Sequence, residues 1–147
     1  MVVKLKLSRG MQEPEYATAG SAAVDLRAAI EEGLEVTLRP GEKALIPTGL
    51  AISPESRDVV AIIAGRSGLG VKNGVTLSNG IGVIDSDYRG EIQVGLINHG
   101  DADFTVRRGD RIAQMFFLPV LHAEFLIVQT LDETERGAGG FGHSGIR

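Results

Sequence analysis

Short runs of apolar residues recur along the whole chain, many of them alternating with polar residues and separated by glycine or proline. Residues 1–7, 34–38 and 91–98 alternate with a period of two, which places successive side chains on opposite faces of a β-strand. Residues 59–64 form a continuous apolar run of strand length, which suits a strand buried on both faces. The pattern predicts a chain built mainly from strands.

Glycine and proline are too frequent for long helices. The chain of 147 residues holds 20 glycines and 5 prolines, so few windows can contain a three-turn helix. Its length suits one domain that buries most of its apolar surface. We therefore predict an all-β domain over residues 1–131 and a glycine-rich arm over residues 132–147. The last apolar run, residues 120–129, is expected to form one strand or two.

The charge and the cysteine count exclude several classes of function. A formal net charge of -4 argues against a general nucleic-acid binder, whose surface carries an excess of basic residues. The absence of cysteine excludes disulfides, thiolate catalysis and cysteine-ligated zinc. The N-terminal strand pattern lacks the long apolar core of a signal peptide or membrane span. We expect a cytoplasmic protein that binds any anion through local arginine and lysine side chains.

Residues 82–91 are predicted to form a β-hairpin with acidic residues at its tip. Apolar residues run up to Asp85, Asp87 follows two residues later, and an Arg-Gly turn precedes the next alternating run. An acid at the end of a strand is held more rigidly than one in a loop, which suits catalysis. Aspartate and serine also form ordinary turns, and the stretch taken alone favours that simpler interpretation.

Asp25 interrupts a run of small and apolar residues, 21–28. A buried carboxylate costs several kcal/mol unless it is paired or hydrogen-bonded. It therefore needs a partner, either Arg27 or Lys43 in a structural ion pair, or a metal ion with its waters. The spacing favours the structural pair.

A glycine-rich stretch follows the apolar run 59–64 and has the composition of a phosphate-binding loop. Arg66, Ser67 and Gly68 offer a guanidinium, a hydroxyl and accessible backbone amides, particularly if a short helix begins there. The alternative is a glycine-rich turn with one solvated arginine. The spacing is not that of a Walker loop.

Two amide side chains and two histidines have open roles. Gln114 interrupts the apolar run 112–118 and needs hydrogen-bond partners, from a core network or from a ligand. Asn79 either makes a turn or contacts the polar edge of a ring, and the turn is favoured. His99 and His122 lack metal-ligand spacing and are expected to have surface roles.

The arm over residues 132–147 combines many glycines with a few side chains that suit a nucleotide. Its composition predicts a mobile segment in the free protein. Arg136 can neutralise phosphate, Phe141 can stack on a base, and His143 and Ser144 add polar groups. A disordered solubilising tail is the alternative, and for a generic tail it would be favoured.

Five stretches together resemble, in order, the motifs of the trimeric deoxyuridine triphosphatases (dUTPases). They are residues 23–26, 66–68, 82–91, 109–114 and 136–142. The resemblance spans residues 22–145. Each motif alone is weak or moderate, but five in the same order are hard to obtain by chance. One departure is Gly65, which stands where the family usually has proline and which loosens the adjoining loop slightly.

The resemblance implies a distorted jelly-roll β-barrel subunit with a flexible glycine-rich C-terminal arm. It implies a homotrimer whose three active sites are each shared between chains, with no nucleic-acid or membrane partner. The implied reaction is hydrolysis of dUTP to dUMP and pyrophosphate, with Mg²⁺ as cofactor, which keeps uracil out of DNA. The arm is then expected to close over a neighbouring site.

The resemblance also implies roles for individual residues. Asp85 is the expected base that activates water for attack on the α-phosphorus, and Asp25 is expected to hold Mg²⁺ through coordinated water. Tyr88 is expected beneath the deoxyribose, and the arm's Phe141 on the uracil. The implied substrate-binding residues are Arg66, Ser67, Gly68, Asn79, Gly82, Val83, Ile84, Tyr88, Gln93, Gln114, Arg136, Phe141, His143, Ser144 and Gly145.

Two other functions are weighed against this one. A dCTP deaminase-related enzyme would need a glutamate placed to act at the pyrimidine ring, and none precedes Asp85 in the hairpin. A non-catalytic nucleotide-binding trimer would be favoured by loss of Asp85 or of the arm, and both are present.

Overall fold

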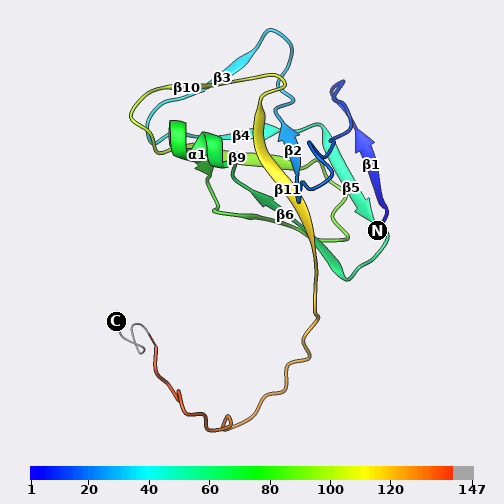
Figure 1. The fold of residues 1–147 in the computed structure, drawn as a ribbon, viewed down its shortest axis with the longest axis vertical. Helices are drawn as coiled ribbons and strands as arrows, with labels where there is room; N and C mark the ends of the chain where they lie inside the picture. Colours follow the sequence, from blue (N-terminus) through cyan, green and yellow to red (C-terminus); the bar gives the residue numbers. More distant parts are fainter. Residues whose placement is uncertain (141–147) are drawn as a thin grey trace.

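The computed structural model describes residues 1–140, which form strands and one short helix (Figure 1). The elements are β1 (Val3–Leu7), β2 (Val24–Arg27), β3 (Glu35–Leu38), β4 (Lys43–Pro47), β5 (Leu50–Pro54), β6 (Val59–Ala64), α1 (Ser67–Asn73), β7 (Val75–Leu77), β8 (Gly82–Ile84), β9 (Gln93–Asn98), β10 (Phe104–Arg107) and β11 (Arg111–Pro119). The prediction of a mainly β chain is confirmed. No helix within residues 1–140 is long and apolar enough to cross a membrane.

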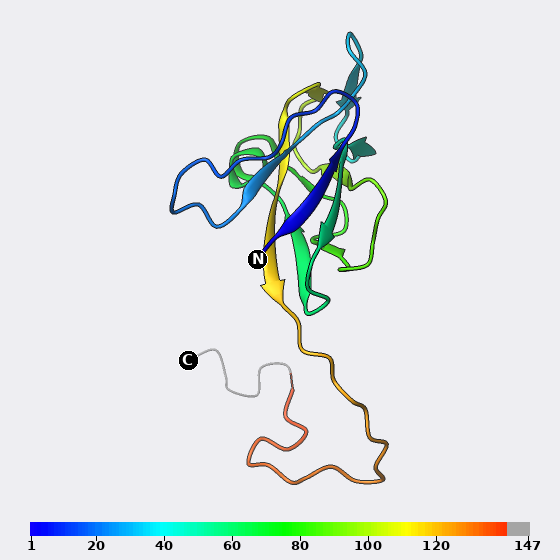
Figure 2. The ribbon, with the colours of Figure 1, turned by 90° about the vertical axis from the view of Figure 1, so that its right-hand side faces the viewer.

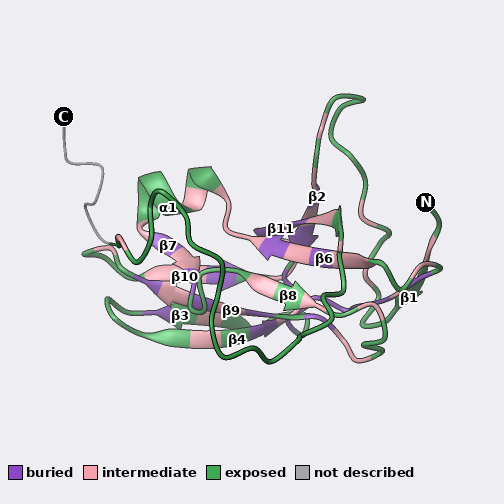
Figure 3. Cartoon of the chain, turned by 90° about the horizontal axis from the view of Figure 1, so that it is seen from below, coloured by how far each residue is buried: buried purple, intermediate pink, exposed green. Residues whose placement is uncertain are grey.

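Every strand pairing within residues 1–140 is antiparallel. A four-stranded sheet has the order β2-β11-β6-β8, and a three-stranded sheet has the order β4-β9-β7. Two smaller sheets pair β1 with β5 and β3 with β10. The core lies on the inward faces of these sheets, where buried residues gather in Figure 3. Its largest fully buried side chains include Leu26, Leu38, Ile46, Ile92, Leu96, Ile112 and Met115.

Within the described chain, strand β6 is buried on one face only, whereas its apolar run was expected to suit burial on both faces. Ala61 and Ile63 are buried, whereas Val60 and Ile62 on the alternate face are only half-buried. The described chain supplies a core on one side of this sheet and leaves the other side partly open to solvent. A continuous apolar run therefore does not require two covered faces within one chain.

Helix α1 begins at Ser67, within the predicted phosphate loop, as the sequence suggested. Gly74 ends it in the left-handed conformation, with φ of 69°, and its N–H donates to the Gly70 carbonyl. A Cβ atom at Gly74 would lie 2.5 Å from the backbone nitrogen of Gly100. Both the left-handed backbone and the lack of space for a Cβ atom therefore require glycine at position 74. The contact between Gly74 and Gly100 anchors the helix to the loop after β9.

The chain leaves the folded body after β11 and runs away from it in an extended path (Figures 1 and 2). The Val120 N–H still donates to the Asp58 carbonyl at 2.9 Å. Beyond it, the exposed fractions of Leu121, Phe125 and Ile127 are 97%, 92% and 97%. The strand predicted within residues 120–129 is absent, because no strand of the described chain lies beside this segment to pair with it.

The predicted boundary between a domain over residues 1–131 and an arm over residues 132–147 stays a prediction. Phe141, His143, Ser144 and Gly145, which were expected to contact the substrate, lie outside the described residues.

Candidate active site

A small pocket lies at the end of β8 and the start of β9. Its volume is about 220 Å³, and it is lined by Val83, Ile84, Asp85, Tyr88, Glu91, Ile92 and Gln93. Five of these seven residues were predicted from the sequence to contact substrate or catalyse its reaction. The volume is below the roughly 300–1,000 Å³ typical of sites for drug-sized ligands. The pocket therefore suits part of a ligand, and the remainder must lie outside it.

Asp85 occupies the first position after β8, at the mouth of this pocket. The β-hairpin predicted over residues 82–91 is wrong, because β8 pairs with β6 whereas β9 pairs with β4 and β7, so this stretch connects two different sheets. Strand β8 pairs with β6, with Gly82 opposite Ile63 and Ile84 opposite Ala61. The turn that follows is closed by the Tyr88 N–H, which donates to the Asp85 carbonyl at 3.1 Å. The Asp85 backbone is thus held by a strand on one side and a hydrogen-bonded turn on the other.

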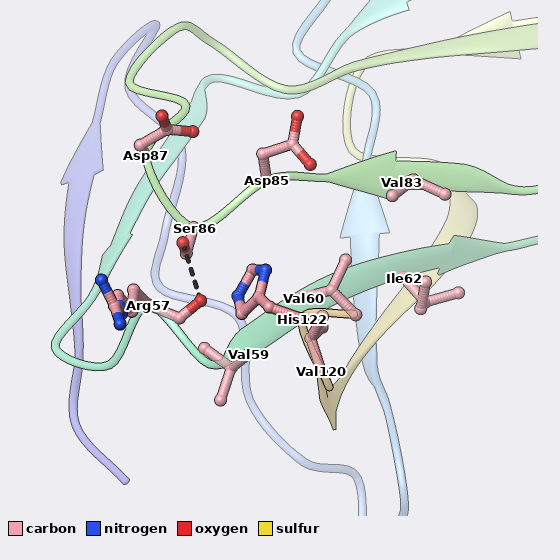
Figure 4. Close-up of a pocket in the computed structure, with 10 residues that line it drawn as sticks. All are labelled: Arg57, Val59, Val60, Ile62, Val83, Asp85, Ser86, Asp87, Val120 and His122. Carbon is pink, nitrogen blue, oxygen red and sulfur yellow. Dashed lines mark hydrogen bonds between the residues drawn. The ribbon is translucent and has the colours of Figure 1, made fainter. Parts of the chain in front are cut away.

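The turn is stabilised by groups other than its carboxylates. The Ser86 hydroxyl donates to the Arg57 carbonyl at 3.2 Å, and Arg89 Nη1 donates to the Ser86 carbonyl at 2.8 Å. Figure 4 shows the carboxylates of Asp85 and Asp87 pointing away from the valines of β6. Asp85 lines both the small pocket and a wider depression of about 800 Å³ on that side. Its carboxylate is therefore accessible to a reacting group.

A second cluster of predicted residues lies where β2, β11 and the end of β6 meet. Arg66 Nε donates to Asp25 Oδ1 at 2.8 Å, and Arg111 Nη1 donates to Asp25 Oδ2 at 3.3 Å. Arg66 Nη1 also lies 3.4 Å from the Arg111 carbonyl, which accepts its hydrogen bond. One carboxylate thus orients two guanidinium groups, which together can bind an anion.

The two side chains predicted to pair with Asp25, Arg27 and Lys43, are not its partners. Arg27 Nη1 donates instead to the Gly109 carbonyl at 2.9 Å, and Lys43 lies in the other large sheet. The register explains the actual pairing, since Asp25 lies opposite Gln114 in β11, and Gln114 lies opposite Ala64 in β6. These pairings bring the residues after Ala64 next to Asp25, and no rule of local spacing contains that information.

Gln114 has the partner that its position in an apolar strand required. Its Nε2 donates to the Gly65 carbonyl at 3.1 Å. That bond fixes the start of the loop that carries Arg66. Ser67 and Gly68 follow as the first residues of α1, and a Cβ at Gly68 would meet nothing within 4 Å. The backbone there is open to close approach by a ligand.

Two predicted residues lie apart from both clusters. Asn79 is exposed in the turn that precedes β8, whereas Asp85 follows the other end of that strand. The Asn79 carbonyl accepts a hydrogen bond from the Ile81 N–H at 2.9 Å. Arg136 lies in the extended segment beyond the body, where its Nε donates to the Gly139 carbonyl at 2.9 Å.

The pocket and the arginine cluster occupy opposite ends of β6. Asp85 follows Ile84, which pairs with Ala61, whereas Arg66 lies five residues beyond Ala61. At a rise of about 3.3 Å per residue, the separation along the strand is on the order of 15 Å. A single described chain therefore does not bring Asp85 and Arg66 to one reacting atom.

Sequence reasoning missed Glu91 and Arg111 as parts of the site. Both lie within stretches that drew attention, 82–91 and 109–114, but neither spacing nor residue type distinguished them from solvated charges. Their importance comes from contacts with residues far away in sequence, Gly49 for Glu91 and Asp25 for Arg111.

A sequence profile of the family described as dUTPase matches residues 10–145. The deoxyuridine 5'-triphosphate nucleotidohydrolase of Serratia proteamaculans is 52% identical over 140 residues, which cover 95% of this chain and 91% of that protein. The corresponding enzyme of Desulfitobacterium hafniense is 55% identical over 133 residues, covering 90% and 87%. The chain belongs to the dUTPase family.

Solved structures of dUTPases share the fold. A dUTPase of Staphylococcus bacteriophage 80alpha with dUPNHPP superposes with a TM-score of 0.86 at 27% identity, over 99% of both chains. The predicted dUTPase-like subunit fold is thereby confirmed, and so is the family to which the five motifs pointed.

Proposed function

We propose that this dUTPase family member hydrolyses dUTP to dUMP and pyrophosphate. The observation that carries the proposal is the pocket between β8 and β9, which gathers five predicted residues around an accessible carboxylate. The close relatives are named as deoxyuridine 5'-triphosphate nucleotidohydrolases, which supports the same reaction here. In a cytoplasmic setting, this reaction would keep uracil out of DNA.

Asp85 acts as the general base. It deprotonates a water molecule that attacks the α-phosphorus, and pyrophosphate leaves from the opposite side. The carboxylate suits this role because β8 and the backbone bond from Tyr88 hold it at the pocket mouth without using its oxygens. A rigidly held base is aligned before the substrate arrives.

Strand β8 selects the pyrimidine ring of the substrate. It is the outer strand in the order β2-β11-β6-β8, so one of its edges pairs with no strand in residues 1–140. The backbone between Asn79 and Ile84, returning near Gln93, pairs with uracil along this edge as a neighbouring strand would. Cytosine presents a donor where the strand already has one, and an unpaired buried donor costs about 1–3 kcal/mol. The Gly82 backbone and the Val83 and Ile84 amides belong to this recognition edge.

The arginine cluster binds the triphosphate. Arg66, the amides of Ser67 and Gly68, and Gln114 hold phosphate oxygens, and Gln114 Nε2 also fixes the loop through the Gly65 carbonyl. Asp25 keeps Arg66 oriented, with 2.8 Å between the carboxylate and Nε. The local cations are needed because the net charge of the chain is -4.

The donor set fits a magnesium ion that is held mainly by the substrate. Residues 1–140 contain no cluster of three or more histidine, aspartate or glutamate side chains arranged to bind a metal. Mg²⁺ commonly keeps several waters and binds one or two carboxylates together with substrate phosphates. The Asp25 oxygens, each already bonded to an arginine, retain lone pairs for a metal-bound water. Bound there, Mg²⁺ would offset the charge of the triphosphate.

The active site is shared between chains of a homotrimer. The separation of Asp85 from Arg66 along β6 supports this, since both must contact one nucleotide. The exposed apolar segment around Phe125 and the open face of β6 provide surface for association. Arg136, with Phe141, His143, Ser144 and Gly145, closes over a neighbour's site and excludes bulk water.

The structure offers little support for a deaminase. Glu91 is the glutamate of the stretch 82–91, and both its oxygens accept hydrogen bonds, Oε1 from the Gly49 N–H at 2.7 Å and Oε2 from Arg9 Nη2 at 3.3 Å. A carboxylate committed to those partners is poorly placed for proton transfer at a pyrimidine ring. A purely binding trimer remains distinct, because it would bind dUTP without turnover.

The deciding experiment measures pyrophosphate release from dUTP, dCTP, dTTP and UTP, each with and without Mg²⁺. We expect rapid release from dUTP with Mg²⁺, slow release without it, and little from the other nucleotides. Comparable turnover of dCTP or UTP would overturn the specificity argument. Binding of dUTP with no release from any nucleotide would establish the non-catalytic alternative.

A further inference from the structure

We infer that Gly90 positions the Tyr88 ring and thereby sets the discrimination between deoxyribose and ribose. The inference rests on the proposed function, in which Tyr88 lies beneath the sugar. Gly90 is not itself a substrate contact. It acts through the ring that packs against it.

The Tyr88 ring occupies the space that any side chain at position 90 would need. A Cβ atom built at Gly90 would lie 2.5 Å from Tyr88 Cζ and 3.0 Å from Cε2, and it would also overlap the phenolic oxygen. Real Cβ atoms do not approach ring carbons so closely. The ring therefore lies directly on the backbone of residue 90.

The backbone conformation of Gly90 does not itself demand glycine. The glycines with positive φ within residues 1–140 are Gly10, Gly33, Gly41, Gly49, Gly74, Gly80, Gly109 and Gly137. Gly90 is outside this group, so an alanine could adopt its backbone angles without strain. Glycine is needed at position 90 because only a residue without a Cβ atom leaves room for the Tyr88 ring.

The tip of the ring is tied to the following residue. Tyr88 Oη donates to the Glu91 carbonyl at 3.1 Å. The Glu91 carboxylate in turn accepts from the Gly49 N–H at 2.7 Å and from Arg9 Nε at 3.0 Å. The hydroxyl end of the ring thus lies against Gly90, and its hydroxyl is bonded to a residue that is itself fixed.

The support behind Glu91 is buried backbone structure. The Thr48 hydroxyl donates to the Ile92 carbonyl at 2.6 Å, and the Ile92 N–H donates to the Leu50 carbonyl at 2.7 Å. Thr48, Leu50 and Ile92 are all buried. The corner between β4 and β5 therefore gives Tyr88 a firm backing.

Such a backing matters for sugar discrimination. A ring that excludes a 2'-hydroxyl must resist displacement by that hydroxyl, and a wall loosened by about 1 Å admits it. With its hydroxyl end against Gly90, Tyr88 lines the pocket and is 44% exposed. Adding a methyl group at position 90 must shift the ring from this position.

The test compares Gly90→Ala with Gly20→Ala, a matched control. Gly20 also lacks a positive φ, and a Cβ there would meet nothing within 4 Å. We expect the ratio of kcat/KM for UTP to that for dUTP to rise about tenfold in Gly90→Ala. The ratio should be unchanged in Gly20→Ala. Tyr88→Phe, which keeps the ring and removes its tether, should raise the ratio about twofold.

A spectroscopic readout reports the ring position without turnover. The chain has two tyrosines and no tryptophan, so in a Tyr16→Phe background Tyr88 is the sole tyrosine emitter. Gly90→Ala in that background should change the quenching of Tyr88 emission by acrylamide, and Gly20→Ala should not. Unchanged quenching together with an unchanged UTP to dUTP ratio would overturn the inference.

Failures of the two proposals are distinguishable. A wild-type protein that does not hydrolyse dUTP contradicts the proposed function, while the quenching experiment still tests the contact between Gly90 and Tyr88. Should Gly90→Ala fail to fold, the double variant Gly90→Ala with Tyr88→Ala removes the ring that the methyl group meets. Recovery of folding in the double variant supports the inference, and continued failure to fold contradicts it.

Discussion

The pocket beside Asp85 and the cluster around Asp25 are built in different ways. In the pocket, Asp85 is placed by strand pairing and a backbone turn, and its carboxylate has no part in holding that turn. In the cluster, the Asp25 carboxylate is itself the connection between Arg66 and Arg111. In the first region the reactive carboxylate does not hold the local structure together, whereas in the second region the carboxylate does. Substitutions should therefore affect activity alone in one region, and activity together with local order in the other.

Asp85→Asn gives the largest expected effect and tests the first half of this contrast. Loss of the general base should lower kcat for dUTP by about 10²–10⁴-fold, while dUTP affinity and thermal unfolding stay near wild-type values. Pyrophosphate release, calorimetric binding and the melting temperature measure the three quantities. Asp87→Asn is the matched control and should leave kcat nearly unchanged. An active Asp85→Asn variant would refute the assignment of the base.

Truncation after Glu135 should have the next largest effect. Removal of residues 136–147 takes away Arg136 and the predicted stacking ring, so turnover of dUTP should fall about a hundredfold through loss of closure. Folding and assembly should persist, because β1 to β11 and the apolar segment before residue 131 are retained. Sedimentation and pyrophosphate release together provide the measurement. Full activity in the truncated chain would show that the arm takes no part in the reaction.

Asp25→Asn tests the second half of the contrast. The substitution weakens the connection to both arginines, so KM for dUTP should rise about tenfold. Stability should fall by about 1–3 kcal/mol, because the side chains of Asp25 and Arg66 are only 25% and 24% exposed and asparagine cannot keep both charged hydrogen bonds. Urea unfolding and steady-state kinetics measure the two effects. Arg111→Gln should change KM in the same direction but less. A variant that lost activity with an unaltered KM would contradict the positioning role.

Glu91→Gln should have the smallest effect of the four. The amide oxygen can still accept from the Gly49 N–H, so only the ion pair with Arg9 is lost, at a cost of about 0–1 kcal/mol. Glu91→Ala removes the carboxylate that binds both Arg9 and the Gly49 N–H. The Gly49 N–H is then unpaired, at a cost of about 1–3 kcal/mol. Chemical unfolding of the two variants separates these contributions. Equal losses would show that the Gly49 bond adds little.

The residues of the pocket beside Asp85 were largely predictable because they are local in sequence, although the hairpin expected to carry them does not form. Val83, Ile84, Asp85, Tyr88 and Gln93 lie within eleven consecutive positions, and the alternation of polar and apolar residues locates the strands on either side. The family resemblance then assigned their roles. Such a site can be predicted when the local pattern locates its residues and a family motif assigns their roles.

The arginine cluster was only half predictable. The need of Asp25 for a partner follows from its apolar surroundings, but the identity of the partner depends on the register of β2, β11 and β6. Register is set by packing of the whole sheet, so it is invisible to spacing along the chain. The same limit applies to the segment over residues 120–129. Its apolar pattern suits a strand, but a strand forms only beside another strand.

In the proposed homotrimer, the exposed segment after β11 makes specific activity depend on protein concentration. Leu121, Phe125 and Ile127 follow a body that is already complete at Pro119, so the body can fold as a single chain before the apolar segment is covered. In the proposed homotrimer, neighbouring chains cover this segment, and their association depends on protein concentration. Specific activity should therefore decline when the protein is diluted and return with a lag that shortens as the concentration rises.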